Sequence, residues 1–175
     1  MTPSSFLLFL LQLCCLQMML VSIPTCMLPG NVVKNTYNKL HSLVGSWIPG
    51  WGSLIVIGSL QCQEWTSLVL YECLREAGNI FAEYDLPEGK DGFMWSGRNF
   101  DNYLMLQERL VVDHQCLNST KASRALSPYF SNITAAVQQQ DDSACGWEIL
   151  RSDLLRVLRR VLHKDRLCLN WTRAH

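Results

Sequence analysis

The sequence predicts an all-α protein, a long-crossover bundle of about five helices. Five segments repeat apolar residues at alternating steps of three and four, which is the spacing of one helix face. No segment sustains the apolar and polar alternation of a half-buried strand. One long connection, residues 45–65, follows the first helix, and it favours a long-crossover bundle over an up-and-down bundle with short loops.

The first 25 residues resemble a secretory signal peptide. Residues 6–20 are almost unbroken apolar sequence without a formal charge, and they are too short for a convincing membrane span. Pro24 and Thr25 provide a cleavage site before Cys26. We therefore expect residues 1–25 to be the signal peptide and residues 26–175 to form one secreted, extracellular domain without stable membrane insertion. The alternative is an uncleaved amino-terminal anchor.

Two helices are expected before residue 85. The first has Asn31 as a possible cap, ends at Gly45, and has the stripe Val33, Tyr37, Leu40 and Val44. The second has the stripe Leu70, Leu74, Ala77, Phe81 and Tyr84, and it should end at the proline and glycines of residues 85–92. Between them, residues 45–65 combine glycine and proline with the apolar run 54–57, and this long loop should cover the bundle or form an interaction surface.

Two further helices are expected between residues 96 and 138. Ser96 can cap a helix that runs to about Leu117, with an inner stripe of Phe100, Leu104, Leu110 or Val111, and Leu117. Ser127 followed by Pro128 has the form of a helix start, a cap and then a first-turn proline. The apolar residues of this fourth helix are Leu126, Phe130, Ile133 and Val137.

The fifth helix, residues 143–163, is strongly amphipathic. Its apolar stripe contains Trp147, Leu150, Leu154, Val157 and Val161, and its other faces carry Arg151, Arg156, Arg159 and Arg160. The arginines could lie on a solvated surface, bind a partner protein, or bind an anionic glycan or a membrane. The neighbouring Glu148, Asp153 and Asp165 weaken the last of these possibilities.

Formal net charge is zero, but the charges are unevenly distributed. Residues 64–113 carry ten acidic and four basic side chains, whereas residues 145–175 carry three acidic and seven basic. This polarity is common for solvated helix faces, and it could also steer an encounter with a charged partner. Neither region has the basic and aromatic pattern of a nucleic-acid interface, so no nucleic-acid partner is expected.

The chain has no pattern typical of an enzyme. His41, His114, His163 and His175 are isolated, no nucleophile stands beside a base, and no C-x-x-C pair is present. His114 and Cys116 indicate a helix end near a disulfide rather than half of a metal site. We expect no catalysis, no metal and no cofactor.

Six cysteines remain after removal of the leader, at positions 26, 62, 73, 116, 145 and 168. An even number in an oxidising compartment favours disulfides, but their spacing does not choose among the pairings. Three glycosylation sequons begin at Asn118, Asn132 and Asn170. Their number supports the secretory route.

Several of these residues resemble the type I interferons, a family of vertebrate helical cytokines. Residues 143–151, Ser-Ala-Cys-Gly-Trp-Glu-Ile-Leu-Arg, are similar to the family's Cys-Ala-Trp-Glu-x-x-Arg signature, with Gly146 where alanine is usual. Residues 69–81 are similar to its second helix, and Cys26-Met-Leu-Pro29 to its mature terminus. The likeness covers residues 26–44 and 66 to about 163, whereas the 45–65 loop is atypical.

The resemblance implies a disulfide map and two receptor contacts. Cys26 would pair with Cys116, and Cys145 with Cys62. Cys73 and Cys168 have no counterparts in the family; they could be free, pair with each other, or form an intermolecular bond. One receptor chain would contact Arg151, Ser152, Leu155 and Arg156, with Leu155 as an exposed anchor between two arginines. The other would contact Tyr71, Glu72, Arg75, Asn79 and Tyr103.

The function that the resemblance implies is that of a secreted antiviral cytokine, a monomer that binds a two-chain cell-surface type I interferon receptor and brings the receptors' cytoplasmic kinases together. One alternative is a secreted, disulfide-bonded carrier or structural domain whose 45–65 segment lines a ligand pocket. Another is a non-functional interferon variant, in which the atypical loop prevents folding or receptor engagement.

Overall fold

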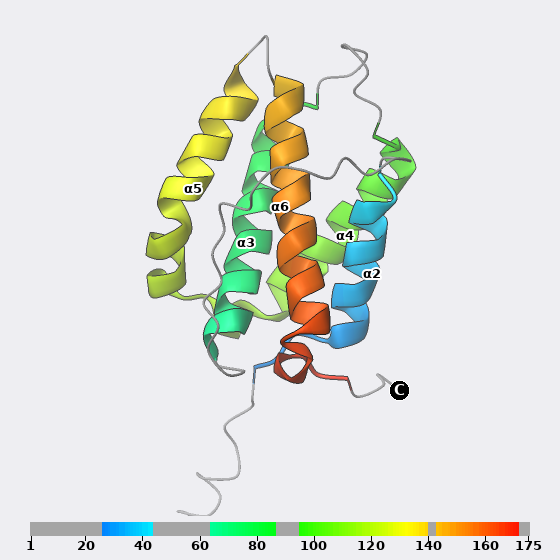
Figure 1. The fold of residues 1–175 in the computed structure, drawn as a ribbon, viewed down its shortest axis with the longest axis vertical. Coiled ribbons are helices and arrows are strands. Elements are labelled where there is room, and N and C mark those ends of the chain that lie inside the picture. Colours follow the sequence, from blue (N-terminus) through cyan, green and yellow to red (C-terminus); the bar gives the residue numbers. More distant parts are fainter. Residues whose placement is uncertain (1–25, 44–63, 87–94, 140–142, 172–175) are drawn as a thin grey trace, which may run out of the picture.

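The protein is an all-α bundle. The computed structural model describes residues 26–43, 64–86, 95–139 and 143–171. The helices are α2 (Gly30–His41), α3 (Glu64–Glu83), α4 (Gly97–Asp113), α5 (Thr120–Gln138) and α6 (Ser143–His163), with short 3-10 turns η1 (Gln115–Leu117) and η2 (Arg166–Cys168) (Figure 1). The all-α prediction is confirmed. The expected signal peptide and most of the 45–65 loop lie outside the described residues.

Helix α6 is the central element of the bundle. It contacts α2, α3 and α5, while α2 also contacts α4, and α3 contacts both α4 and α5 (Figure 1). The predicted stripe of α6 is buried throughout, from Trp147 to Val161. Leu155 and Leu158 are buried as well, because helices flank α6 on more than one side. A single apolar stripe therefore understates how much of α6 is covered.

The predicted helix boundaries hold for α6 but not for α5. Helix α5 begins at Thr120, and the Ser119 hydroxyl accepts a hydrogen bond from the Ala122 amide at 3.4 Å. The predicted start at Ser127 and Pro128 is wrong, since both residues lie inside the helix. A proline inside a helix lacks the amide for one backbone hydrogen bond and crowds the carbonyl group four residues earlier. The buried residues on either side of Pro128 pack α5 into the bundle and hold the helix together across it.

Two smaller predictions are also corrected. Helix α2 begins at Gly30 with Pro29 in the capping position, so Asn31 is inside the first turn. Helix α4 follows Ser96 as predicted, but it ends at Asp113 and the chain continues in the separate turn η1. The buried Leu117 lies on that turn.

The two ends of the described chain are joined. The Gly30 amide donates to the Asn170 carbonyl at 2.7 Å, and the Asn170 amide donates to the Leu28 carbonyl at 2.9 Å. The Trp171 ring covers Gly30 so closely that a Cβ atom there would lie 2.6 Å from it. A disulfide between Cys26 and Cys116 ties the same end to the turn after α4. Among the described residues, no helix is long and apolar enough to cross a membrane.

Candidate functional site

Trp147, in the first turns of α6, is fully buried. Its ring stacks on Phe81 of α3, with centroids 5.3 Å apart and ring planes 10° from parallel. Trp95, just before α4, meets Trp147 edge-on at 6.3 Å. The tryptophan of the signature therefore joins three parts of the chain in one aromatic cluster.

Glu148 and Arg151 form a polar clasp beside this cluster. The Trp95 Nε1 group donates to Glu148 Oε1 at 2.7 Å, and Arg151 Nε donates to Glu148 Oε2 at 3.2 Å. Arg151 Nη1 also donates to the Leu40 carbonyl at 3.5 Å. Arg151 is only 5% exposed, so its guanidinium group connects α6 to the end of α2 and is not offered to solvent. The expectation that Arg151 presents a surface contact is wrong.

The clasp belongs to a wider set of hydrogen bonds around the carboxyl end of α2. The Ser96 amide donates to the Leu43 carbonyl at 3.2 Å, and Asn99 Nδ2 donates to the Ser42 carbonyl at 3.3 Å. The last carbonyl groups of a helix lack partners within it and need donors from elsewhere. Here α6 supplies a donor to Leu40 in the last turn of α2, and the start of α4 supplies donors to Ser42 and Leu43 just after it. These bonds set the position of residues 40–43, the last ones described before the long connection.

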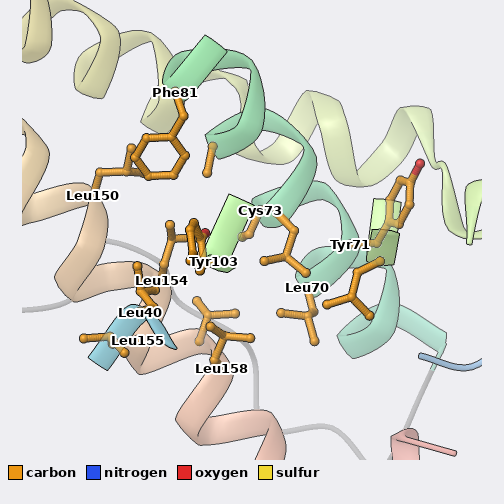
Figure 2. Close-up of a cluster of buried hydrophobic side chains, with 14 of the residues drawn as sticks. Leu40, Leu70, Tyr71, Cys73, Phe81, Tyr103, Leu150, Leu154, Leu155 and Leu158 are labelled. Carbon is orange, nitrogen blue, oxygen red and sulfur yellow. The ribbon is translucent and has the colours of Figure 1, made fainter. Parts of the chain in front are cut away.

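The other α6 residues of the first predicted contact divide into one buried and two accessible side chains. Leu155 is 5% exposed and belongs to the core cluster that includes Leu40 and Leu158 (Figure 2). The predicted exposed anchor is therefore wrong, because α6 is buried on more than its main stripe. Ser152 and Arg156 are partly exposed.

Arg156 is anchored by a buried carboxylate. Its Nη1 atom lies 3.6 Å from Oδ1 of Asp153, and Tyr129 of α5 donates to Oδ2 of the same residue at 3.0 Å. Burial, with Asp153 as the neighbouring anion, raises the pKa of Tyr129 above its ordinary value, so Tyr129 remains a donor. This arrangement holds the Arg156 guanidinium group at the α6 surface while leaving part of it accessible.

Three of the five residues predicted for the second contact are core residues. Tyr71, Glu72 and Tyr103 are buried, and Figure 2 shows both tyrosines in the buried cluster. Burial raises the pKa of each tyrosine hydroxyl above its ordinary value. These three side chains are not surface contacts, and that part of the prediction is wrong. Because tyrosine and glutamate carry polar groups, the sequence alone does not indicate that the bundle buries these side chains.

Arg75 and Asn79 remain accessible on α3. Arg75 makes two bonds to the fully buried Glu72, from Nη2 to Oε1 at 2.6 Å and from Nε to Oε2 at 3.1 Å, and it also pairs with Glu76. The hydrogen bonds to Glu72 raise the pKa of the Arg75 guanidinium group above its ordinary value. Arg75 therefore both neutralises a buried carboxylate and forms part of the surface.

Arg75 and Asn79 border a groove of about 380 Å³ between α3 and α4. Its other lining residues are mainly apolar and include Leu74, Gly78, Phe81, Ala82, Leu104, Val111 and Val112. Gln107 crosses the groove floor and donates from Nε2 to the Leu74 carbonyl at 2.7 Å. The neighbouring Met105 is 63% exposed and Val112 is 55% exposed. Sequence reasoning missed this groove, although Met105 and Val112 lie off the inner stripe of α4 and could have indicated it.

The cysteines agree with only half of the expected disulfide map. The Cys26–Cys116 disulfide is present. Cys145 is an exposed free thiol, so the expected pairing with Cys62 is wrong. Cys168, at the opposite end of α6, is disulfide-bonded to a partner outside the described residues. Cys168, for which the resemblance gives no counterpart, is therefore disulfide-bonded, whereas Cys145 is not.

Thiol labelling checks this map. We expect iodoacetamide to modify Cys145 in the native protein, and to modify Cys73 only after denaturation, because burial raises the pKa of Cys73 to about 12 and removes both access and the reactive thiolate. Non-reducing peptide mapping should recover Cys26 joined to Cys116. Recovery of Cys145 joined to Cys62 would contradict the map.

Gly146, the departure from the family signature, has a steric explanation. A Cβ atom at this position would lie 2.9 Å from both the Ala136 carbonyl carbon and the Val137 amide nitrogen of α5. Real Cβ atoms do not approach backbone so closely, so any side chain would push α5 and α6 apart. Glycine is required here by the close contact between these two helices.

Gly146→Ala should therefore lower the free energy of unfolding by about 1–3 kcal/mol, the usual cost of overpacking. Urea denaturation monitored by circular dichroism measures the change. The matched control is Gly97→Ala in the first turn of α4, where nothing lies within 4 Å of the added atom. The control should be neutral or slightly stabilising, and equal unfolding midpoints for the two variants would contradict the steric account.

The three sequon asparagines are all exposed. Asn118 follows η1, Asn132 lies on α5, and Asn170 lies in the carboxyl-terminal segment. Their glycosylation stays a prediction. Among the described residues, no cluster of histidine, cysteine, aspartate and glutamate could hold a metal ion.

The described helices have the fold of a helical cytokine like the interferons, as the match to a solved structure shows. The described chain is similar to the solved structure of zebrafish interferon 2, with a TM-score of 0.60 and 23% sequence identity. The match covers 79% of this chain and 99% of that one. No family model and no curated protein sequence matches the chain.

Proposed function

We propose that this protein is a secreted antiviral cytokine that binds a two-chain type I interferon receptor and triggers kinase-coupled signalling by bringing the two chains together. The observation that carries the proposal is the match to almost the whole length of zebrafish interferon 2. The signature on α6 supports it, because its tryptophan, glutamate and arginine build the centre of this bundle. The protein acts through geometry and is not proposed to catalyse a reaction.

The first receptor surface is the outer side of α6 at Ser152 and Arg156. These two residues are one helical turn apart and partly exposed. Arginine is favoured at protein interfaces because its planar group pairs with carboxylates and its stem covers apolar surface. Arg151 and Leu155 are buried, so Ser152 and Arg156 are the part of the expected contact that a partner can reach.

The second receptor surface is the groove between α3 and α4, with Arg75 and Asn79 on its border and Met105 and Val112 exposed on α4. An apolar groove with a few polar groups suits the insertion of side chains from a partner. Two surfaces on different helices allow two chains to bind one cytokine simultaneously.

The two surfaces differ in charge. Helices α3 and α4 together carry seven acidic and three basic residues, whereas α6 carries two acidic and four basic. Complementary patches on two receptor chains would steer each chain to its own surface. The uneven distribution of charge along the sequence is therefore also a difference in charge between these helices of the bundle.

Two single variants test the two-surface proposal. Arg156→Gln removes a charge but keeps a donor for the buried Asp153, and Asn79→Arg adds bulk and charge on the border of the groove. Each should reduce the potency of receptor-reporter signalling by about tenfold or more, as expected for loss of a central interface contact. Thermal unfolding of Asn79→Arg should change little, because Asn79 is exposed. Arg156→Gln removes the cation beside the buried Asp153 and should lower the unfolding temperature, so its potency is compared at a temperature where circular dichroism shows that it is folded.

A competition assay distinguishes the two surfaces. Excess Asn79→Arg protein should inhibit signalling by the parent, because it still occupies one receptor chain, whereas the double variant should neither signal nor inhibit. Parent-like signalling by both single variants would contradict the assigned surfaces. A secreted, folded parent that activates no receptor reporter would overturn the cytokine proposal, and cargo in a lipid extract of that protein would favour the carrier alternative.

A further inference from the structure

Two stretches at one end of the bundle are together rich in basic residues. They are residues 26–34 and 159–171, and we call them the basic end. Its basic residues are Lys34, Arg159, Arg160, His163, Lys164 and Arg166. The only acidic residue in these two stretches is Asp165, whose Oδ2 atom lies 3.7 Å from Arg160 Nε.

Three cations of the basic end are available to a partner. Arg159, Lys164 and Arg166 are exposed, and none forms an ion pair with an acidic side chain among the described residues. By contrast, Arg151 and Arg156 are paired with Glu148 and Asp153. The exposed cations without an acidic partner among the described residues are therefore Arg159 in the last turns of α6, Lys164 just after it, and Arg166 in η2.

Several contacts hold the two stretches of the basic end together. The backbone bonds between Gly30 and Asn170 join its two stretches. Arg166 lies over the Trp171 ring at 4.5 Å, and Trp171 Nε1 donates to the Arg166 carbonyl at 2.9 Å. The Ser67 hydroxyl of α3 donates to the Cys168 carbonyl at 3.3 Å. The cations thus project from a fixed scaffold, which lowers the entropy lost when a partner binds.

We propose that the basic end binds sulfated glycosaminoglycans, the linear polyanions of cell surfaces and extracellular matrix. Three exposed cations that form no ion pair with an acidic side chain among the described residues match a chain that carries a sulfate or carboxylate on most of its sugars. Arginine favours sulfate because it can donate two parallel hydrogen bonds. The large negative charge density of such a chain adds counterion release to each contact.

An anionic membrane fits this surface less well. Stable interfacial binding needs a broad apolar face beside the cations. Leu167 is 84% exposed, but Trp171 is packed on Gly30 and covered by Arg166, so it is not free to insert. A single exposed leucine does not provide such a face.

The proposed glycan surface borders one receptor surface and lies apart from the other. Arg159 is one helical turn beyond Arg156 on the same face of α6, whereas the groove between α3 and α4 is lined by other helices. Glycan binding would hold the secreted protein near cells without a direct role in receptor assembly. Heparin binding by the purified protein tests it without a signalling readout.

The test is salt elution of the intact secreted protein from immobilised heparin. The parent should bind at 0.15 M NaCl, and Arg159→Glu combined with Lys164→Glu should lower the affinity by at least about tenfold, because two cations that pair with sulfate groups, and the counterion release that they cause, are lost. The matched control is Arg98→Glu with Arg109→Glu, which makes the same charge change at exposed positions of α4. The control should elute with the parent.

Three results would overturn the proposal. The first is equal elution of the basic-end variant and the α4 control. The second is tighter binding of the parent to phosphatidylserine vesicles than to heparin. The third is a loss of reporter signalling by the basic-end variant on cells that lack glycosaminoglycans, since this would assign Arg159 and Lys164 to the receptor surface. Unchanged signalling on those cells, with weaker heparin binding, supports the proposal.

Discussion

Replacing Arg75 with methionine is expected to lower the free energy of unfolding by about 3–5 kcal/mol. Glu72 is fully buried. Arg75, one turn later on α3, donates two hydrogen bonds to the Glu72 carboxylate and supplies its counter-charge. Methionine keeps most of the apolar stem but leaves the carboxylate buried without that cation. Urea denaturation followed by circular dichroism measures the loss.

Two further variants establish the cause. Arg109→Met removes an arginine from an exposed pair with Asp113, and it should change stability by less than about 0.5 kcal/mol. Glu72→Gln combined with Arg75→Met removes both charges, so the double variant should be more stable than Arg75→Met alone. If adding Glu72→Gln restored no stability, the buried carboxylate would not be the source of the effect.

This structural role affects how the α3 surface can be tested. Loss of signalling in an Arg75 variant would combine a changed contact with a weakened fold. Asn79 is exposed and borders the same groove without supporting a buried charge. Substitution of Asn79 is therefore the informative change for receptor binding, and Arg75 is the informative change for stability.

The fold was predictable where burial is regular along one helix face. The stripe from Trp147 to Val161 determines α6, and the spacing from Leu70 to Phe81 determines α3. The start of α5 was not predictable from Pro128, because a proline accepted inside a helix has the same local pattern as one that begins it. Packing against helices that are distant in the sequence decides between these two cases, and the local sequence does not contain that information.

The candidate site was predictable in its residues but not in their exposure. The signature located Trp147, Glu148 and Arg151 on α6, yet a charged side chain such as Arg151 is usually placed at the surface by pattern alone. Its burial depends on a carbonyl of α2, more than a hundred residues earlier in the chain. The same limit applies to Leu155 and Tyr103, which are covered by helices distant in sequence.

Arg151→Met should lower the free energy of unfolding by about 2–3 kcal/mol, because it removes charge-assisted hydrogen bonds to Glu148 and to the Leu40 carbonyl in a buried setting. The Ser96 amide, which donates to Leu43 beside the clasp, should exchange its hydrogen faster. Denaturation and native-state hydrogen exchange measure these two effects. Any loss of receptor affinity should be indirect, through displacement of the end of α2.

Arg159→Met is the matched control, since Arg159 is exposed and has no acidic partner among the described residues, and its stability should change by less than about 0.5 kcal/mol. Arg151→Lys should be intermediate, because an ammonium group keeps the charge but cannot bridge Glu148 and Leu40 with a planar fork. If Arg151→Met unfolded at the parent's urea concentration, kept the parent's Ser96 exchange rate and still lost receptor binding, Arg151 would be a direct receptor contact. Parent-like binding of a destabilised Arg151→Met protein, once folded at low temperature, would instead place its whole role inside the bundle.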